Sequence, residues 1–188
     1  MGSGKSTVLK ILEGLGYPVF DADGLAKNQY EREDVKQAML NIFGSQCMVD
    51  NQIDKHYIAS RIFQNSSEKE KVEAILYPLV FAEIKQISLK YQDSICFTEV
   101  PLLYESHAET YFDLVLLIQS EQSIVNQRLI KMRHYTQAKI DARLKHQWSM
   151  DKKMVLADDI ITNNQDETQL IKQVIAYSDK IKREYGKK

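Results

Sequence analysis

The sequence predicts a three-layer α/β fold, in which a parallel sheet lies between two layers of helices. Segments with the apolar pattern of strands alternate along the chain with segments that have the pattern of helices, as in α/β proteins. Residues 114–118 also form the continuous run Leu-Val-Leu-Leu-Ile. Strands that are apolar throughout are typical of a parallel sheet buried on both faces.

The N-terminal part of the chain predicts a helix and then a strand. Apolar side chains recur at helical spacing over residues 8–15, and Gly14 and Gly16 mark the end of that helix. Residues 17–20 predict a short buried strand, which two aspartates follow.

The next segment, residues 33–91, has a mainly helical pattern, with a polar turn at residues 50–52. Ser67 and Glu70 have the spacing of a capping box, which predicts that a helix begins there. Pro78 is expected to start or kink the next helix, because proline disrupts a helix interior.

The C-terminal half returns to alternation. A strand is predicted over residues 94–100, and a helix over residues 121–132 follows the Leu-Val-Leu-Leu-Ile strand. A highly charged stretch covers residues 131–153. A short strand at residues 159–162 then precedes an amphipathic helix that ends near Glu184.

The composition excludes several classes of protein. The chain has 188 residues, 44% of them hydrophobic, so it can bury a sizeable core. Its 25 basic and 26 acidic side chains argue against a role in coating nucleic acid or a membrane surface. The two cysteines, Cys47 and Cys96, match no metal spacing and no disulfide framework, and no run of 18 apolar residues occurs. We expect a soluble protein of the reducing cytoplasm.

The strongest chemical signal is the opening segment Met-Gly-Ser-Gly-Lys-Ser-Thr, residues 1–7. Gly2 and Gly4 allow a tight turn of backbone amides around a phosphate group, and a helix N-terminus follows. Lys5 would reach the β- and γ-phosphates, and the Ser6 hydroxyl would bind Mg²⁺. A flexible tail and an N-myristoylation signal are the weaker alternatives.

The full phosphate-loop pattern is G-x-x-x-x-G-K-[ST], and its first glycine would fall before Met1. The strand that normally leads into such a loop would fall there too. We therefore expect the natural protein to begin upstream, with Met1 inside the loop.

Two acids follow the strand at residues 17–20. Asp21 and Asp23 are expected at the carboxyl end of this strand, where open α/β sheets bind ligands. A kinase that phosphorylates an alcohol gains from a carboxylate that orients the hydroxyl and takes its proton. The alternative for either residue is to cap the helix that begins near Gly24.

Segments along nearly the whole chain resemble dephospho-CoA kinases, a family of P-loop kinases. The resemblance rests on the phosphate loop, Leu-Gly at 15–16, V-F-D-A-D-G-L-A at 19–26, R-I-F at 61–63, L-Y-P-L-V at 76–80, V-P-L-L-Y-E at 100–105 and A-D-D-I-I-T-N-N at 157–164. The combination of D-A-D with P-L-L-x-E is far more specific than the loop alone.

The resemblance implies a P-loop kinase fold with a helical substrate insertion and a lid. Residues 1–28, 92–131 and 154–188 would form the nucleotide-binding core. Residues 29–91 would form the helical substrate domain, which binds the CoA moiety, and residues 132–153 the mobile lid.

The activity implied by the resemblance is transfer of the ATP γ-phosphoryl group to the ribose 3′-hydroxyl of dephospho-CoA, the last step of coenzyme A biosynthesis. ATP and Mg²⁺ would be required, and Asp23, the second acid of D-A-D, would be the general base. No nucleic-acid or membrane partner is expected, and the protein would be a monomer or a small homo-oligomer. The alternatives are another kinase of the nucleoside-monophosphate type, a nucleotide-binding protein without an acceptor, and a truncated, poorly active kinase.

Further candidates lie after the strand at residues 94–100. Glu99 follows residues 95–98 at the end of this strand and is a candidate Mg²⁺ ligand, with a substrate-orienting role as the alternative. The acceptor pocket would be lined by Pro101, Leu102 and Leu103. For Glu105, a surface ion pair is an equal alternative to a functional role.

The remaining candidates come from the insertion, the charged stretch and the last strand. Tyr77 stands where the family often has histidine and is a candidate substrate contact. Arg133 is the first candidate for a lid cation that stabilises the transferring phosphoryl group, with Lys152 or Lys153 as the second. Asn163 would hydrogen-bond adenine or form a simple turn.

The other cations of this region are expected on a solvated helical face, and they include Arg128. Trp148 would pack the lid or lie against a base.

Overall fold

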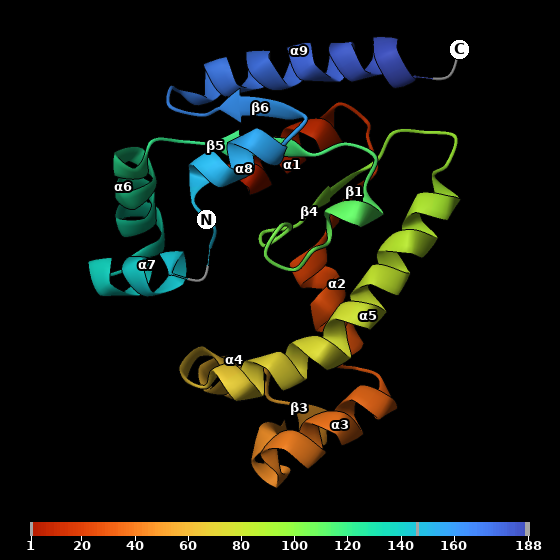
Figure 1. Ribbon diagram of the computed structural model, residues 1–188, viewed down its shortest axis with the longest axis vertical. Coiled ribbons are helices and arrows are strands. Elements are labelled where there is room, and N and C mark those ends of the chain that lie inside the picture. The colour runs from red at the N-terminus through yellow and green to blue at the C-terminus, as the bar shows by residue number, and fades with distance from the viewer. Residues whose placement is uncertain (1, 146, 187–188) are drawn as a thin grey trace. The chain divides into compact units, whose positions relative to one another are not determined.

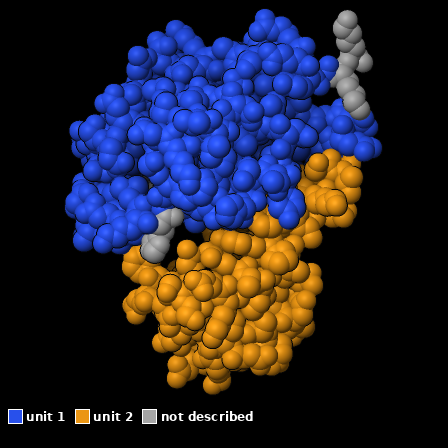
Figure 2. Space-filling model, in the orientation of Figure 1, with its two compact units in different colours: residues 1–20, 91–188 blue, residues 21–90 orange. Residues whose placement is uncertain are grey.

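The structure is a computed structural model that describes residues 2–145 and 147–186 (Figure 1). The chain forms two compact units (Figure 2). Unit 1 comprises residues 1–20 and 91–188, and unit 2 comprises residues 21–90.

Unit 1 contains most of the strands together with helices from both ends of the chain. Its elements are α1 (Lys5–Gly14), β1 (Val19–Asp21, which ends on the first residue of unit 2), β4 (Phe97–Glu99), a 3₁₀ turn (Glu109–Tyr111), β5 (Leu116–Gln119), α6 (Gln122–Arg133), α7 (Gln137–Leu144), α8 (Met150–Leu156), β6 (Asp159–Thr162) and α9 (Glu167–Tyr185).

The strands of unit 1 pair as two short ladders within the described residues. β1 pairs with β4, and β5 pairs in parallel with β6, from Leu116 opposite Asp159 to Gln119 opposite Thr162. The α/β class predicted from the sequence is therefore confirmed. No described strand of unit 1 is longer than the segment that predicted it, because a residue counts as strand only where it has a hydrogen-bonded neighbour.

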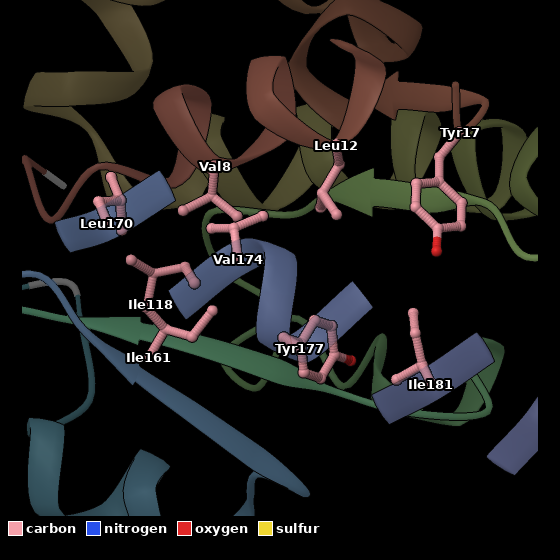
Figure 3. Close-up of a cluster of buried hydrophobic side chains, with 9 residues drawn as sticks. All are labelled: Val8, Leu12, Tyr17, Ile118, Ile161, Leu170, Val174, Tyr177 and Ile181. Atoms are coloured by element: carbon pink, nitrogen blue, oxygen red, sulfur yellow. The ribbon is translucent and has the colours of Figure 1, made fainter. Parts of the chain in front are cut away.

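The core of unit 1 lies between α1, α9 and the β5–β6 pair (Figure 3). α1 packs against α9 and β4, α9 packs against β6, and α8 contacts β5. The buried hydrophobic residues of α9 recur at intervals of three or four positions, so one face of this helix meets the core. The cluster consists of Val8, Leu12, Tyr17, Ile118, Ile161, Leu170, Val174, Tyr177 and Ile181.

Unit 2 is helical apart from one hairpin. Its elements are α2 (Ala22–Gln29), α3 (Glu33–Phe43), a 3₁₀ turn (Ser45–Cys47), β2 (Met48–Val49), β3 (Gln52–Ile53), α4 (Lys55–Gln64) and α5 (Ser66–Lys90). The predicted polar turn becomes the tip of the antiparallel β2–β3 hairpin. Asp50 and Asn51 have φ values of 49° and 61° there, as the central residues of a tight hairpin turn require.

The long helix α5 corrects the predicted capping box and excludes one of the two alternatives for Pro78, the start of a helix. It begins at Ser66, because Asn65 Oδ1 accepts the amides of Ser67 and Glu68, so the capping residue is Asn65 and the predicted box is wrong. Pro78 lies inside α5 and neither starts nor ends it.

Packing explains why this helix tolerates an interior proline. Four side chains of α5 lie four positions apart and are all buried: Val72, Leu76, Val80 and Ile84. Burying each such side chain stabilises by about 1.5–3 kcal/mol, and together these gains exceed the roughly 3 kcal/mol that an interior proline costs. Pro78 itself is exposed, on the side away from this buried row.

The described helices and the two cysteines concern the environment in which the protein works. Among the described residues, each helix is too short or too polar to cross a lipid bilayer. Both cysteines are free thiols: Cys47 is buried in unit 2, and Cys96 is half-buried. Burial raises the pKa of both thiols, so neither has the character of a reactive thiolate.

Candidate active site

The phosphate loop, residues 2–7, has the backbone shape that the sequence predicts. Gly2 and Gly4 have φ values of 75° and 98°, in the left-handed region that glycine adopts without strain. The Gly4 carbonyl accepts the amides of Thr7 and Val8, both at 3.0 Å, so α1 begins directly behind the loop. A Cβ atom at Gly4 would lie 2.2 Å from Asn163 Nδ2, so a larger residue would also collide.

The start of α1 favours an anion. The first amides of a helix have no carbonyl acceptor within the helix, and the helix dipole adds positive potential there. The first turn of α1 contains no acidic residue that would compete for these groups. Lys5 is half-buried at this position, and Ser6 is exposed beside it. The loop can therefore hold a phosphate chain with Lys5 as its cation.

The loop is held from behind by residues that follow β5 and β6. Ser3 is only 3% exposed, and its carbonyl accepts hydrogen bonds from Asn163 Nδ2 at 2.8 Å and from Ser120 Oγ at 3.3 Å. Ser120 Oγ lies 2.7 Å from the Asn163 carbonyl as well. The carboxyl ends of the β5–β6 pair thus fix the backbone of the phosphate loop.

Arg128 of α6 completes this arrangement. Its guanidinium donates to Ser120 Oγ at 3.2 Å and to Asn163 Oδ1 at 3.3 Å. The sequence prediction of a solvated face for Arg128 is wrong, because its guanidinium binds the residues that directly follow β5 and β6. The only sequence signal was its position two turns into the helix after a buried strand. Asn163 is 6% exposed. Its amide nitrogen donates to the Ser3 carbonyl, and its amide oxygen accepts from Arg128.

The two acids after β1 have different local roles. The carboxylate of Asp21 caps α2, accepting the amides of Asp23 and Gly24 at 3.1 Å each. The capping alternative therefore applies to Asp21. Asp23 is exposed in the first turn of α2, where its charge is compatible with the helix dipole.

The candidates that follow β4 lie along one loop of unit 1. Glu99 is the last residue of β4 and is half-buried. Pro101, Leu102 and Leu103 are half-buried in the turn that follows. Their turn is closed by hydrogen bonds from the Ser106 and Ala108 amides to the carbonyls of Leu102 and Leu103.

Tyr77 belongs to unit 2, where it lies half-buried on α5. Its hydroxyl donates to Glu73 Oε1 at 2.8 Å, and its ring centroid lies 5.6 Å from that of Phe81. Tyr77 and the candidates of unit 1 therefore belong to different units. A contact between Tyr77 and the substrate stays a prediction.

A buried ion pair links the loop after β4 to the end of the predicted lid. Lys153 Nζ lies 2.6 Å from Glu105 Oε1, with side chains 10% and 11% exposed, and the Trp148 amide donates to the same oxygen at 2.7 Å. Burial raises the pKa of Glu105, but Lys153 and the Trp148 amide outweigh it and hold the pKa below its ordinary value. Of the two readings for Glu105, the structure shows an ion pair, and a buried one.

Aromatic contacts reinforce this junction. The rings of Trp148 and Tyr104 stack in parallel at a centroid distance of 6.2 Å. Lys152 Nζ lies 3.1 Å from the centroid of the Trp148 ring, so both lysine candidates for the lid cation, Lys152 and Lys153, interact within unit 1. Trp148 thus packs between Tyr104 and Lys152.

Arg133, the first candidate for a lid cation, ends α6, and its side chain lies outside the described part of the structure. Its role stays a prediction.

Comparison with known protein families agrees with the sequence motifs. The family model described as dephospho-CoA kinase matches residues 1–169. A dephospho-CoA kinase of Fusobacterium nucleatum subsp. nucleatum is 30% identical over 182 residues, which cover 96% of this chain and 94% of that protein. A dephospho-CoA kinase of Protochlamydia amoebophila is 32% identical over 170 residues, covering 87% and 84%.

Solved structures share the fold. TT1252 from Thermus thermophilus superposes with a TM-score of 0.83 at 24% identity, covering 96% of this chain and 92% of that one. A dephospho-CoA kinase from Campylobacter jejuni gives a TM-score of 0.74 at 24% identity, covering 97% and 94%.

Proposed function

The chain belongs to the dephospho-CoA kinase family, and we propose how its own residues perform the ATP-dependent phosphorylation of dephospho-CoA, the last step of coenzyme A biosynthesis. The observation that supports this proposal best is the phosphate loop, with Gly4 in the left-handed region, Lys5 beside it and α1 directly behind. The alternative of a flexible tail does not account for this geometry.

The loop binds the triphosphate of ATP. Its amides and the N-terminus of α1 surround the β- and γ-phosphates, and Lys5 neutralises charge on their oxygens. Because phosphoryl transfer needs little covalent help from a protein, positioning and electrostatic stabilisation supply most of the rate enhancement.

Asp23 acts on the acceptor. Its carboxylate takes the proton of the ribose 3′-hydroxyl while the hydroxyl oxygen bonds to the γ-phosphorus. The bond from that phosphorus to the β,γ-bridging oxygen breaks, and its electron pair leaves with ADP. Asp21 is the poorer candidate for this base, because its carboxylate already accepts two backbone amides.

Oxygen donors of the chain suit Mg²⁺, which prefers hard ligands. Mg²⁺ keeps several waters and takes few protein ligands, so two protein oxygen donors suffice for it. The exposed Ser6 hydroxyl and the Glu99 carboxylate are the proposed protein donors. Bound there, the ion would neutralise phosphate charge.

The remaining roles divide between acceptor and lid. Pro101, Leu102 and Leu103 form the wall of the acceptor site, and Tyr77 contacts the substrate from the helical domain. Residues 29–91 constitute that domain and residues 132–153 the lid, in which Arg133 stabilises charge on the transferring phosphoryl group.

An acceptor panel tests this function. ADP release from ATP should rise at least tenfold when dephospho-CoA is added, and nucleoside monophosphates should give no comparable rise. Stimulation by a nucleoside monophosphate would instead identify the other kinase class. Slow hydrolysis that no acceptor accelerates would identify a nucleotide-binding protein.

A further inference from the structure

The peptide that joins Ser3 to Gly4 is held in one orientation. Its carbonyl points to Asn163 Nδ2 and Ser120 Oγ, at 2.8 and 3.3 Å. In a trans peptide the carbonyl and the N–H point in opposite directions, so fixing the Ser3 carbonyl also fixes where the Gly4 N–H points. A flipped peptide would turn an oxygen toward the bound phosphates and would lose both hydrogen bonds.

Asn163 can hold this carbonyl only if its amide presents nitrogen to it. The Arg128 guanidinium donates to the other end, Oδ1, at 3.3 Å, and it has no acceptor with which to pair the amide nitrogen. With the amide rotated by half a turn, the Asn163 oxygen would face the Ser3 carbonyl and its NH₂ would face the guanidinium. Both contacts would be repulsive.

Burial makes this choice of orientation matter. Ser3 and Asn163 are 3% and 6% exposed, so water cannot easily replace a lost partner. Asn163 also packs so closely against Gly4 that a Cβ atom at position 4 would collide with its amide nitrogen.

We propose that Asn163 and Arg128 are positioning residues for the nucleotide site. Asn163 holds the Ser3–Gly4 peptide so that its N–H serves the phosphates, and Arg128 acts through Asn163 by fixing the amide orientation. Neither residue needs to touch the nucleotide. This inference rests on the proposed function, in which the loop binds ATP, and it assigns Asn163 to the loop instead of adenine.

Binding of MgATP is the first measurement. Asn163→Ala should raise the dissociation constant of ATP about tenfold, the scale of one buried hydrogen bond and its unpaired acceptor. The KM for ATP should rise with it, while kcat at saturating ATP and the KM for dephospho-CoA stay within about twofold. A fold defect without a positioning role would lower kcat and the melting temperature and leave the KM for ATP unchanged.

The neighbouring asparagine supplies a matched control. Asn164 lies in the same loop, but its amide bonds to the backbone and side chain of Glu121 at 2.8 and 2.9 Å, not to Ser3. Asn164→Ala should leave the dissociation constant of ATP within about twofold of the wild-type value. An equal loss in both variants would mean that the loop as a whole, not the Ser3 contact, determines binding.

A double-mutant cycle tests whether Arg128 acts through Asn163. Arg128→Met should weaken ATP binding about threefold in the wild-type background and have no effect in the Asn163→Ala background. The same loss in both backgrounds would show that Arg128 does not act through Asn163, and would overturn its assigned role. ATP binding that survives Asn163→Ala unchanged would overturn the role of Asn163. A wild-type protein that binds no ATP would instead overturn the proposed function.

Discussion

At the scale of single residues, the two aspartates of D-A-D illustrate how a local contact separates two similar side chains. Both were candidates for the catalytic base when only their place after a strand was known. In the structure, Asp21 caps α2 with both carboxylate oxygens, whereas Asp23 is exposed one residue into that helix. A capping carboxylate is needed by the backbone, so Asp23 is the better base.

Replacing Asp23 tests this distinction. Asp23→Asn should lower kcat by roughly two to four orders of magnitude, because an amide cannot take the hydroxyl proton. ATP binding, measured by titration, should be retained. Asp21→Asn is the matched control, since asparagine caps helices about as well as aspartate, and its kcat should change by less than about threefold. Unchanged turnover in Asp23→Asn would remove Asp23 from the mechanism.

At the scale of elements, the sequence is informative where the pattern is local. The 159–162 strand, the ends of α6 and α9, and the phosphate loop all lie where periodicity and glycines predict them. Pro78 shows where a local signal leaves two alternatives open: it does not start a helix but lies inside α5, where tertiary burial outweighs the cost of an interior proline.

The contacts between distant elements could not be predicted from local sequence patterns. Asn163 bonds to Ser3 across 160 positions of sequence, and Arg128 meets Asn163 across 35. Neither pairing leaves a periodic signal, because each depends on how distant strand ends fold together. The sequence therefore predicted the loop and its lysine, and did not predict what holds the loop.

The Glu105–Lys153 pair is an element-scale prediction about stability. Glu105→Gln leaves Lys153 buried without its partner and should lower the free energy of unfolding of unit 1 by about 3 kcal/mol near pH 7. Urea titration followed by the fluorescence of Trp148, the one tryptophan in the chain, would measure this, because Trp148 lies at the junction.

The same pair predicts a pH dependence. The folded-state pKa of Glu105 lies below its ordinary value of 4.5, so the pair stabilises the fold above about pH 4.5 and is lost as pH falls through the folded-state pKa. The gap between wild type and Glu105→Gln should therefore shrink below pH 4.5. Glu33→Gln, which breaks a pair with Lys36 in which the Glu33 side chain is 87% exposed, should cost less than about 0.5 kcal/mol. Equal costs for the two variants would contradict a buried, stabilising pair.

At the scale of the whole molecule, the proposed machinery is distributed over both units. Unit 1 contains the phosphate loop with Lys5, and unit 2 contains Asp23. A net charge of −1 leaves phosphate recognition to this local site instead of a general basic surface. The proposed activity therefore uses residues of both units, and its tests use the full chain.

The position of the transferred phosphate is the decisive observation for the whole molecule. After incubation with ATP and dephospho-CoA, phosphorus–proton correlation NMR of the product should place the new phosphomonoester on the ribose 3′-oxygen. Lys5→Met, which removes the loop cation, should slow its formation at least about a hundredfold. Phosphate that appears only as inorganic phosphate or on another hydroxyl, or product formation that does not depend on Lys5, would contradict phosphoryl transfer from this loop to the 3′-hydroxyl.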